Sequence, residues 1–232
     1  GVKVQVLMDS IANLGTPASL FRPLQEAGGR VLRLKPYLTH YRGHRKIVVI
    51  DGAIGYIGGM NIGEKYLGLA PRKTPWRDTQ LRLQGEGVAV LHAYFRQDWL
   101  CALPAREFAR LGNAAAAPSP APVSGDSFCQ FVAGGADTPG ERIKMCYLSL
   151  IRSARRSICI QSPYFIPDPS VLDALQTAAA SGVHIRLMIP GVSSSFYLEP
   201  LTLYFAGQLL DYGAEVYRYQ GYLHAKTMLI DD

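Results

Sequence analysis

The sequence lacks any long apolar run. No stretch reaches the roughly 18 residues that a membrane-spanning helix needs, and no leader pattern opens the chain. The first residues already have a strand pattern and the last follow one, so we expect a chain cut at both ends from a longer protein. The absence of a membrane span and a leader from this chain therefore does not exclude either of them from the longer protein.

Cysteine is scarce and unpatterned. The four residues are Cys101, Cys129, Cys146 and Cys159, and they show no C-x-x-C or metal-ligand spacing. A chain of 232 residues with 48% apolar content can bury a core without disulfides. We predict reduced, mostly buried thiols and no metal site.

Neither sign of charge dominates the composition. The 24 basic and 18 acidic residues give a net charge of +6. This charge fits an anionic partner, nucleic acid or phospholipid, without choosing between them. Many soluble proteins carry the same charge with no such partner.

Strand and helix patterns alternate along the chain. We expect strands at 2–8, 31–34, 77–83, 128–132, 157–161, 183–189 and 215–219, and helices at 17–27, 88–100, 141–153, 170–180 and 198–211. This alternation predicts an α/β fold with mixed sheets flanked by helices. A Pro/Ala/Ser-rich linker at 114–125 would separate a first domain, 1–113, from a second, 126–232.

One pattern, H-x-K-x-x-x-x-D, occurs twice, from His44 to Asp51 and from His224 to Asp231. On a strand, His44 and Lys46 would point the same way about 7 Å apart, a base beside a fixed positive charge. The apolar run 47–50 predicts a buried central strand, and Asp51-Gly52 predicts a tight hairpin turn.

The two patterns belong to a longer internal repeat. Residues 1–8 parallel 182–189, and residues 27–34 parallel 212–219. Each copy reaches its histidine 43 or 42 residues after its first glycine. Two copies indicate a duplicated domain, and a pseudo-two-fold arrangement would bring both His/Lys pairs to one interface.

Two histidines and two lysines at a shared site suit displacement at phosphorus. One imidazole attacks to form a covalent phosphohistidine, the other protonates the leaving oxygen, and the lysines hold the phosphate oxygens. The scheme requires no metal and no cofactor. The alternative, two ordinary core histidines, does not explain why the pattern recurs at the same place in the repeat.

Several other stretches add to the two motifs. They are Gly58-Gly59-Met60-Asn61, Trp76-Arg77-Asp78-Thr79, S-P-Y-F-I-P-D at 162–168, and Tyr222-Leu223 before His224. With them the chain resembles the phospholipase D superfamily over nearly its whole length, and more narrowly the bacterial cardiolipin synthases. The resemblance implies duplicated phospholipase-D-like domains.

The resemblance also implies roles for residues. His44 would be the nucleophile and His224 the general acid and base, while Lys46, Lys226 and Asn61 would bind the phosphate. The implied reaction makes cardiolipin and glycerol from two molecules of phosphatidylglycerol, at the cytoplasmic membrane of a bacterium. Phospholipid is then favoured over nucleic acid as partner. Two alternatives stay open: a phospholipase D or nuclease in which water resolves the intermediate, and an inactive phosphate-binding scaffold.

The chain departs from the family pattern in two places. Gly59 stands where members commonly have serine, which removes one hydroxyl donor to the phosphate. The glycine-serine-asparagine stretch and the acidic residue that follow the second motif in the family lie beyond Asp232. We expect a longer chain to supply them.

The aspartates need separate treatment. Asp51 lies on the opposite strand face from His44, so we assign it, and its counterpart Asp231, to structural roles in the motif. Asp78 is our candidate to orient His44, because a nucleophilic imidazole needs its other ring nitrogen bonded to a carboxylate and the family's acidic residue falls there. The alternative is a surface aspartate paired with Arg77 or Arg82.

The remaining candidate residues have a less specific link to catalysis or binding. Tyr164, with Phe165, follows an expected strand end and is our candidate for substrate contact, although core packing explains both equally well. We expect His92 and His184 to be structural and His40 to be a loop residue. The apolar stretch 195–205 fits contact with a bilayer and fits a core helix equally well.

Overall fold

The computed structural model describes residues 1–35, 43–69, 74–111, 125, 127–135, 138, 140–193 and 195–231. They form two compact units, one of Gly1–Ile57 with Arg82–Phe131 and one of Gly58–Leu81 with Val132–Asp232. We had expected a single division between 1–113 and 126–232. The structure instead groups 58–81 with the C-terminal unit. Residues 114–124 of the expected linker lie outside the described residues.

The first unit contains two small sheets and three helices besides a 3-10 turn. A parallel pair, β1 and β2, precedes a three-stranded sheet of order β3-β4-β6. The elements are β1 (Gln5–Asp9), the 3-10 turn η1 (Ala18–Phe21), α1 (Arg22–Glu26), β2 (Arg30–Leu34), β3 (Ile47–Ile50), β4 (Ile54–Gly58), β6 (Gln80–Gln84), α2 (Gly87–Ala102) and α3 (Ala105–Leu111).

The hairpin predicted after the first motif is present. Strands β3 and β4 pair in antiparallel fashion, and Asp51 and Gly52 both take positive φ angles, 52° and 67°. Two such residues make the turn whose twist matches a hairpin. The prediction of a buried central strand is wrong, because β3 lies at the edge of its sheet and its Val48 and Ile50 side chains are 43% and 44% exposed.

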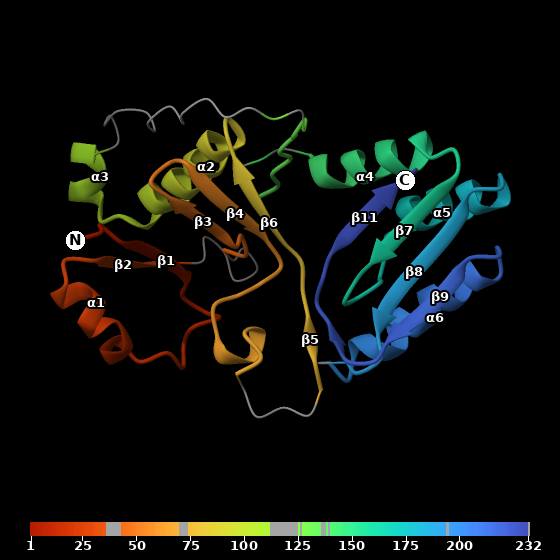
Figure 1. Cartoon of the computed structure of the whole chain (residues 1–232), viewed down its shortest axis with the longest axis horizontal. Helices are drawn as coiled ribbons and strands as arrows, with labels where there is room; N and C mark the ends of the chain where they lie inside the picture. Colours follow the sequence, from red (N-terminus) through yellow and green to blue (C-terminus); the bar gives the residue numbers. More distant parts are fainter. Residues whose placement is uncertain are drawn as a thin grey trace. The chain divides into compact units, whose positions relative to one another are not determined.

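The second unit is built on a four-stranded mixed sheet of order β11-β7-β8-β9 (Figure 1). A short parallel pair, β5 with β10, lies in the same unit. The elements are the 3-10 turn η2 (Glu64–Tyr66), β5 (Trp76–Arg77), α4 (Arg142–Ser153), β7 (Ser157–Gln161), α5 (Pro169–Ala180), β8 (His184–Pro190), α6 (Leu198–Leu210), β9 (Glu215–Tyr219), β10 (Tyr222–Leu223) and β11 (Thr227–Ile230).

Strand β8 anchors the core of the second unit. Its alternate residues Ile185, Leu187 and Ile189 are at most 1% exposed, and the register sets Leu187 beside Ile160 of β7. Helices α4, α5 and α6 pack onto this cluster through fully or almost fully buried side chains, which are Ile151, Leu175 and Leu209. Side chains alternate between buried and less buried along this central strand, and helices pack on the sheet, which confirms the predicted α/β fold.

The internal repeat reappears in strand register. In the first unit Gln5 lies opposite Arg30, and in the second Arg186 lies opposite Glu215. These are the same positions of the two aligned copies. Both copies therefore build the same parallel pair, as the sequence repeat predicts.

Several expectations are corrected. The strand expected at 77–83 is interrupted, because β5 ends at Arg77 and β6 begins at Gln80. No strand forms over the described residues 128–132. The cysteines are free, but Cys101 and Cys129 are exposed and Cys146 and Cys159 half-buried, so the prediction of mostly buried thiols is wrong. Among the helices the structure describes, none has the length and apolarity to cross a membrane.

Candidate functional site

Both His/Lys pairs lie just before a strand. His44 and Lys46 precede β3, and His224 and Lys226 fall between β10 and β11, whereas we had expected them within strands. Each lysine Nζ donates a hydrogen bond to the backbone oxygen of its own histidine, at 2.7 Å from Lys46 and 2.6 Å from Lys226. The two motifs thus share one local conformation, in which the strand begins after the lysine.

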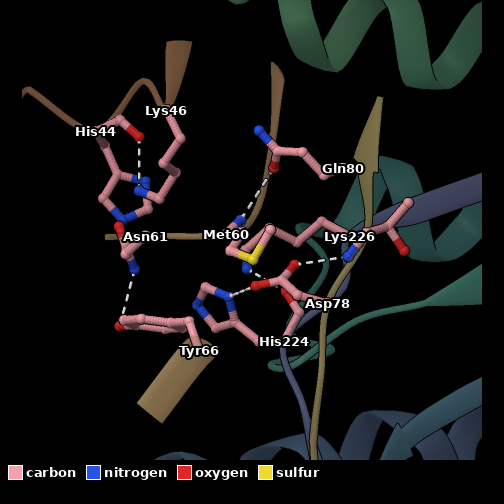
Figure 2. Close-up of polar contacts among 10 residues, drawn as sticks. His44, Lys46, Met60, Asn61, Tyr66, Asp78, Gln80, His224 and Lys226 are labelled. Atoms are coloured by element: carbon pink, nitrogen blue, oxygen red, sulfur yellow. Dashed lines mark hydrogen bonds and ion pairs between the residues drawn. The ribbon is translucent and has the colours of Figure 1, made fainter. Parts of the chain in front are cut away.

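The second unit holds a histidine–carboxylate pair. His224 Nδ1 lies 2.7 Å from Asp78 Oδ2, and the other carboxylate oxygen accepts the backbone N–H of Thr79 at 2.9 Å (Figure 2). The side chains of His224 and Asp78 are 17% and 5% exposed. A buried carboxylate on Nδ1 holds the proton on that nitrogen, so proton exchange with a substrate falls to Nε2.

Asp78 has a different partner from the one we expected. We had assigned it to His44, with a surface ion pair as the alternative, but the structure pairs this almost buried carboxylate with His224. The cause is the parallel pairing of β5 with β10, where Leu223 lies opposite Arg77 and the His224 N–H donates to the Arg77 oxygen at 2.7 Å. The next residues along the two strands, Asp78 and His224, then meet. No pattern in a single sequence predicts this pairing.

Gly59 leaves room for the carboxylate. Its N–H donates to the Thr79 oxygen at 3.0 Å, so the backbone passes close to the segment that carries Asp78. A Cβ atom added to Gly59 would overlap Asp78 Oδ1. The absence of serine, which we read only as a lost hydroxyl, is therefore also what makes space for Asp78 in this position.

Asn61 has a partner that sequence reasoning missed. Its Nδ2 donates to the Tyr66 hydroxyl at 2.9 Å, and Tyr66 comes from η2 (Figure 2). The Tyr66 ring lies 6.3 Å from the His224 ring, centroid to centroid. This places the Asn61 side chain, through Tyr66, in the neighbourhood of the histidine.

Aromatic rings surround His224. The Trp76 ring is 5.3 Å from His224, stacks on Tyr222 at 5.7 Å, and meets the edge of Tyr66 at 4.8 Å. Tyr164 lines the same pocket as Trp76 and His224, whereas its neighbour Phe165 is 5% exposed and belongs to the core. The sequence contains these aromatics in recognisable stretches, but only the β5–β10 pairing brings them together.

The surroundings of Lys226 shift its pKa. Burial of its ammonium group lowers the pKa of Lys226, and the neighbouring Asp78 carboxylate partly opposes that shift. Lys226 is suited to hold an anionic group beside His224.

The motif aspartates make turn and backbone contacts. Asp51 forms part of the β3–β4 turn. Asp231, also at positive φ (57°), accepts the backbone N–H groups of Arg155, Arg156 and Ser157 at 2.7, 2.7 and 2.9 Å. These bonds tie the end of β11 to the start of β7.

The other histidines lie in the scaffold or outside the described residues. His184 Nε2 lies 3.0 Å from Glu215 Oε1, across the β8–β9 pair. His92 belongs to α2, in the first unit. His40 lies outside the described residues. Of the stretch 195–205, residues 198–205 form the first part of α6, where Thr202 is buried and Tyr204 is 63% exposed. Tyr197, just before the helix, is 81% exposed.

The chain is similar to known proteins. Residues 147–232 match the family model described as "Cardiolipin synthase, PLD-like domain". The major cardiolipin synthase ClsA of Bacillus subtilis is 42% identical over 240 residues, and a cardiolipin synthase of Listeria monocytogenes is 37% identical over 246. Both alignments cover 100% of this chain and 49% of the relative. Residues 147–232 therefore form a phospholipase-D-like domain of the cardiolipin synthase type.

A solved structure has a similar fold. A phosphatidylserine synthase from Haemophilus influenzae superposes with a TM-score of 0.63 at 12% identity, over 98% of this chain and 63% of that one. At this identity the likeness concerns the fold alone. The chain spans about half the length of the cardiolipin synthases that it matches.

Proposed function

We propose that this chain is part of a phosphatidyltransferase that makes cardiolipin and glycerol from two molecules of phosphatidylglycerol. The observation that carries the proposal is the His224–Asp78 pair, in which a carboxylate 2.7 Å from Nδ1 leaves Nε2 for general acid and base catalysis. The similarity of the whole chain to cardiolipin synthases supports a phospholipid substrate.

In the first step, His44 attacks the phosphorus of one phosphatidylglycerol. A P–N bond forms, the bond from phosphorus to the glycerol headgroup breaks, and His224 gives the Nε2 proton to the departing glycerol oxygen. Lys46, Lys226 and Asn61 bind the phosphate oxygens as negative charge gathers on them. The product is a phosphatidyl-histidine and free glycerol.

In the second step, the headgroup hydroxyl of another phosphatidylglycerol replaces glycerol. His224, now unprotonated at Nε2, takes the hydroxyl proton, the oxygen bonds to phosphorus, and the P–N bond to His44 breaks. Cardiolipin leaves and both histidines return to their starting states. Asp78 stabilises the imidazolium form that His224 has before the first step and regains in the second.

We propose a membrane surface as the place of this reaction, in a bacterial cell on the cytoplasmic side. Helix α6 supports it, because the helix is apolar on both sides. Ala206 and Leu209 are buried in the core, while Leu201 and Tyr204 on another side are 45% and 63% exposed. A helix that is apolar all round belongs in a larger core or against lipid.

Labelled phosphatidylglycerol in mixed micelles tests the reaction with the full-length protein. We expect labelled cardiolipin and free glycerol in equal amounts. Phosphatidic acid as the only product would establish a hydrolase instead, and binding without turnover would establish a scaffold.

A trapping experiment tests the nucleophile. After brief mixing with phosphatidylglycerol labelled in its phosphate, denatured native protein should retain the label, and His44→Ala should not. His184→Gln is the matched control, because His184 is an exposed histidine on the β8–β9 surface. Label retained by His44→Ala would refute the assignment.

A further inference from the structure

A small pocket adjoins His224 within the second unit. Its lining includes Trp76, Pro163, Tyr164, Pro190, Tyr222 and His224. We call it the indole pocket. It has room for about one water-sized group, so it can take a single hydroxyl of a headgroup and excludes an acyl chain.

The indole pocket contains a hydrogen-bond donor without a partner. Trp76 Nε1 is buried, and among the described residues nothing accepts its hydrogen. Leaving a buried donor unsatisfied destabilises the fold. Tyr222 stacks on the Trp76 ring and Tyr66 meets it edge-on, which hold the indole in one orientation. A phenylalanine would give similar stacking without that cost, so the N–H itself calls for an explanation.

The residues that line the indole pocket favour a neutral ligand. Apart from His224, no charged side chain contributes to the pocket. An anionic phosphate would be poorly held there. Aromatic rings also bind organic cations, but Lys65 Nζ already lies 4.9 Å from the Tyr66 ring and 5.5 Å from the Trp76 ring, and its charge repels a second cation.

We infer that the indole pocket binds one hydroxyl group of the glycerol headgroup, with the Trp76 N–H donating to the oxygen of that hydroxyl. This inference rests on the proposed phosphatidyl transfer and names the subsite for its alcohol. In the second step the bound glycerol gives the proton of its attacking hydroxyl to His224 Nε2, its oxygen bonds to phosphorus, and the P–N bond of the phosphohistidine breaks. Trp76 thereby favours an alcohol over water as the attacking group.

Replacement of the indole N–H tests the subsite in the full-length protein. Trp76→Phe should lower the ratio of cardiolipin to phosphatidic acid about tenfold, the effect of one hydrogen bond of roughly 1.4 kcal/mol. The KM of free labelled glycerol for exchange into phosphatidylglycerol should rise by about the same factor. At saturating phosphatidylglycerol, label trapped on His44 in the first turnover should fall far less than the product ratio, because the first step needs no attacking alcohol.

Two controls separate the donor from the ring. Trp99→Phe changes the chain's other tryptophan, which lies on α2 in the first unit, and should leave the product ratio and the glycerol KM as they are. Benzothienylalanine at position 76 keeps the shape of indole but lacks its N–H, so it should reproduce the effect of Trp76→Phe even if the phenylalanine variant is less stable.

The outcomes are distinct. Native protein that yields cardiolipin, together with an unchanged product ratio in both position-76 variants, overturns the subsite and leaves the transferase standing. An equal fall in trapping and in transfer would also overturn it, because Trp76 would then act only by supporting His224. Native protein that forms no cardiolipin overturns the proposed function and the subsite with it.

Discussion

At the scale of single residues, the contact between Asp78 and His224 matters most. An imidazole that both gives and takes a proton must present the same nitrogen each time, and a carboxylate 2.7 Å from Nδ1 enforces this. The carboxylate also steadies the positive charge that the ring acquires. Both effects require the negative charge of the Asp78 carboxylate as well as its hydrogen bond to His224.

Asp78→Asn removes the charge and keeps the shape. We expect kcat for cardiolipin formation to fall about 10²- to 10⁴-fold, because general acid–base catalysis contributes about that much. Steady-state kinetics on the full-length protein measures it. Asp173→Asn, an exposed position on α5, is the matched control and should stay at the native rate.

Gly59→Ser restores the residue common in the family and should still impair the enzyme. The new Cβ would overlap Asp78 Oδ1, so the carboxylate must shift away from His224. Misplacement by about 1 Å can cost about 100-fold, and we expect a fall of that order in kcat. The pH profile should move as well, which a loss of folded protein would not cause.

Gly207→Ala provides the comparison for that variant. Gly207 lies in α6 with open space where its Cβ would be, so alanine should fit without a shift. Native activity in Gly59→Ser would show that Asp78 is held by contacts other than the clearance at Gly59.

At the scale of elements, Asp231 links β11 to β7. Its carboxylate accepts three backbone N–H groups, and those of Ser157 and Arg156 lower its pKa below the ordinary value of 3.8. A carboxyl group whose pKa is lower in the folded state stabilises the fold above its unfolded pKa. That contribution is lost as the pH falls through the folded pKa.

Asp231→Asn should therefore lower the melting temperature by a few degrees at pH 7. Asparagine tolerates the positive φ angle of this position, so the change tests the charge and not the backbone. The difference from native protein should shrink below about pH 3.8. Thermal melts from pH 2.5 to 7 measure it, and a constant difference would contradict the linkage.

Leu187→Ala tests the central strand β8. Leu187 is 0% exposed in the core of the second unit, and removal of a buried leucine costs about 2–5 kcal/mol. Leu229→Ala on β11 starts from a side chain that is 51% exposed and should cost far less. Urea denaturation followed by far-UV circular dichroism compares the two. Equal losses would mean that β8 does not anchor the core.

The local patterns were the predictable part of the fold. Alternating apolar residues gave β8, the Asp-Gly dipeptide gave the β3–β4 turn, and the repeat gave two parallel pairs in matching register. The β5–β10 pairing was not predictable, because two residues of each strand carry too little pattern to reveal a partner 146 positions away. The identity of the partner of Asp78 depends on that pairing, and so it was misassigned.

At the scale of the whole molecule, contact with lipid depends on surfaces as well as charge. The net charge of +6 favours an anionic surface, while the exposed side of α6 offers Leu201 and Tyr204 for insertion. Surface charge attraction weakens in salt, whereas buried apolar area does not.

The double variant Leu201→Ser/Tyr204→Ser should weaken binding of the full-length protein to phosphatidylglycerol vesicles several-fold. The difference should persist in 0.5 M salt, because the lost contribution is apolar. Vesicle sedimentation measures the bound fraction. Leu14→Ser, at a side chain that is 78% exposed in the first unit, is the matched control. Unchanged binding of the double variant would show that the exposed side of α6 does not contact the vesicle.

The separation of Asp78 from His224 along the chain has a consequence for synthesis. A ribosome adds roughly 5–20 residues per second, so the 146 positions between them take about 7–30 s. Throughout that interval Trp76 and Asp78 have been made but β10 has not. The proposed acid–base pair therefore cannot form until that interval has passed, and a nascent chain released before His224 is made would lack it however well its first unit had folded.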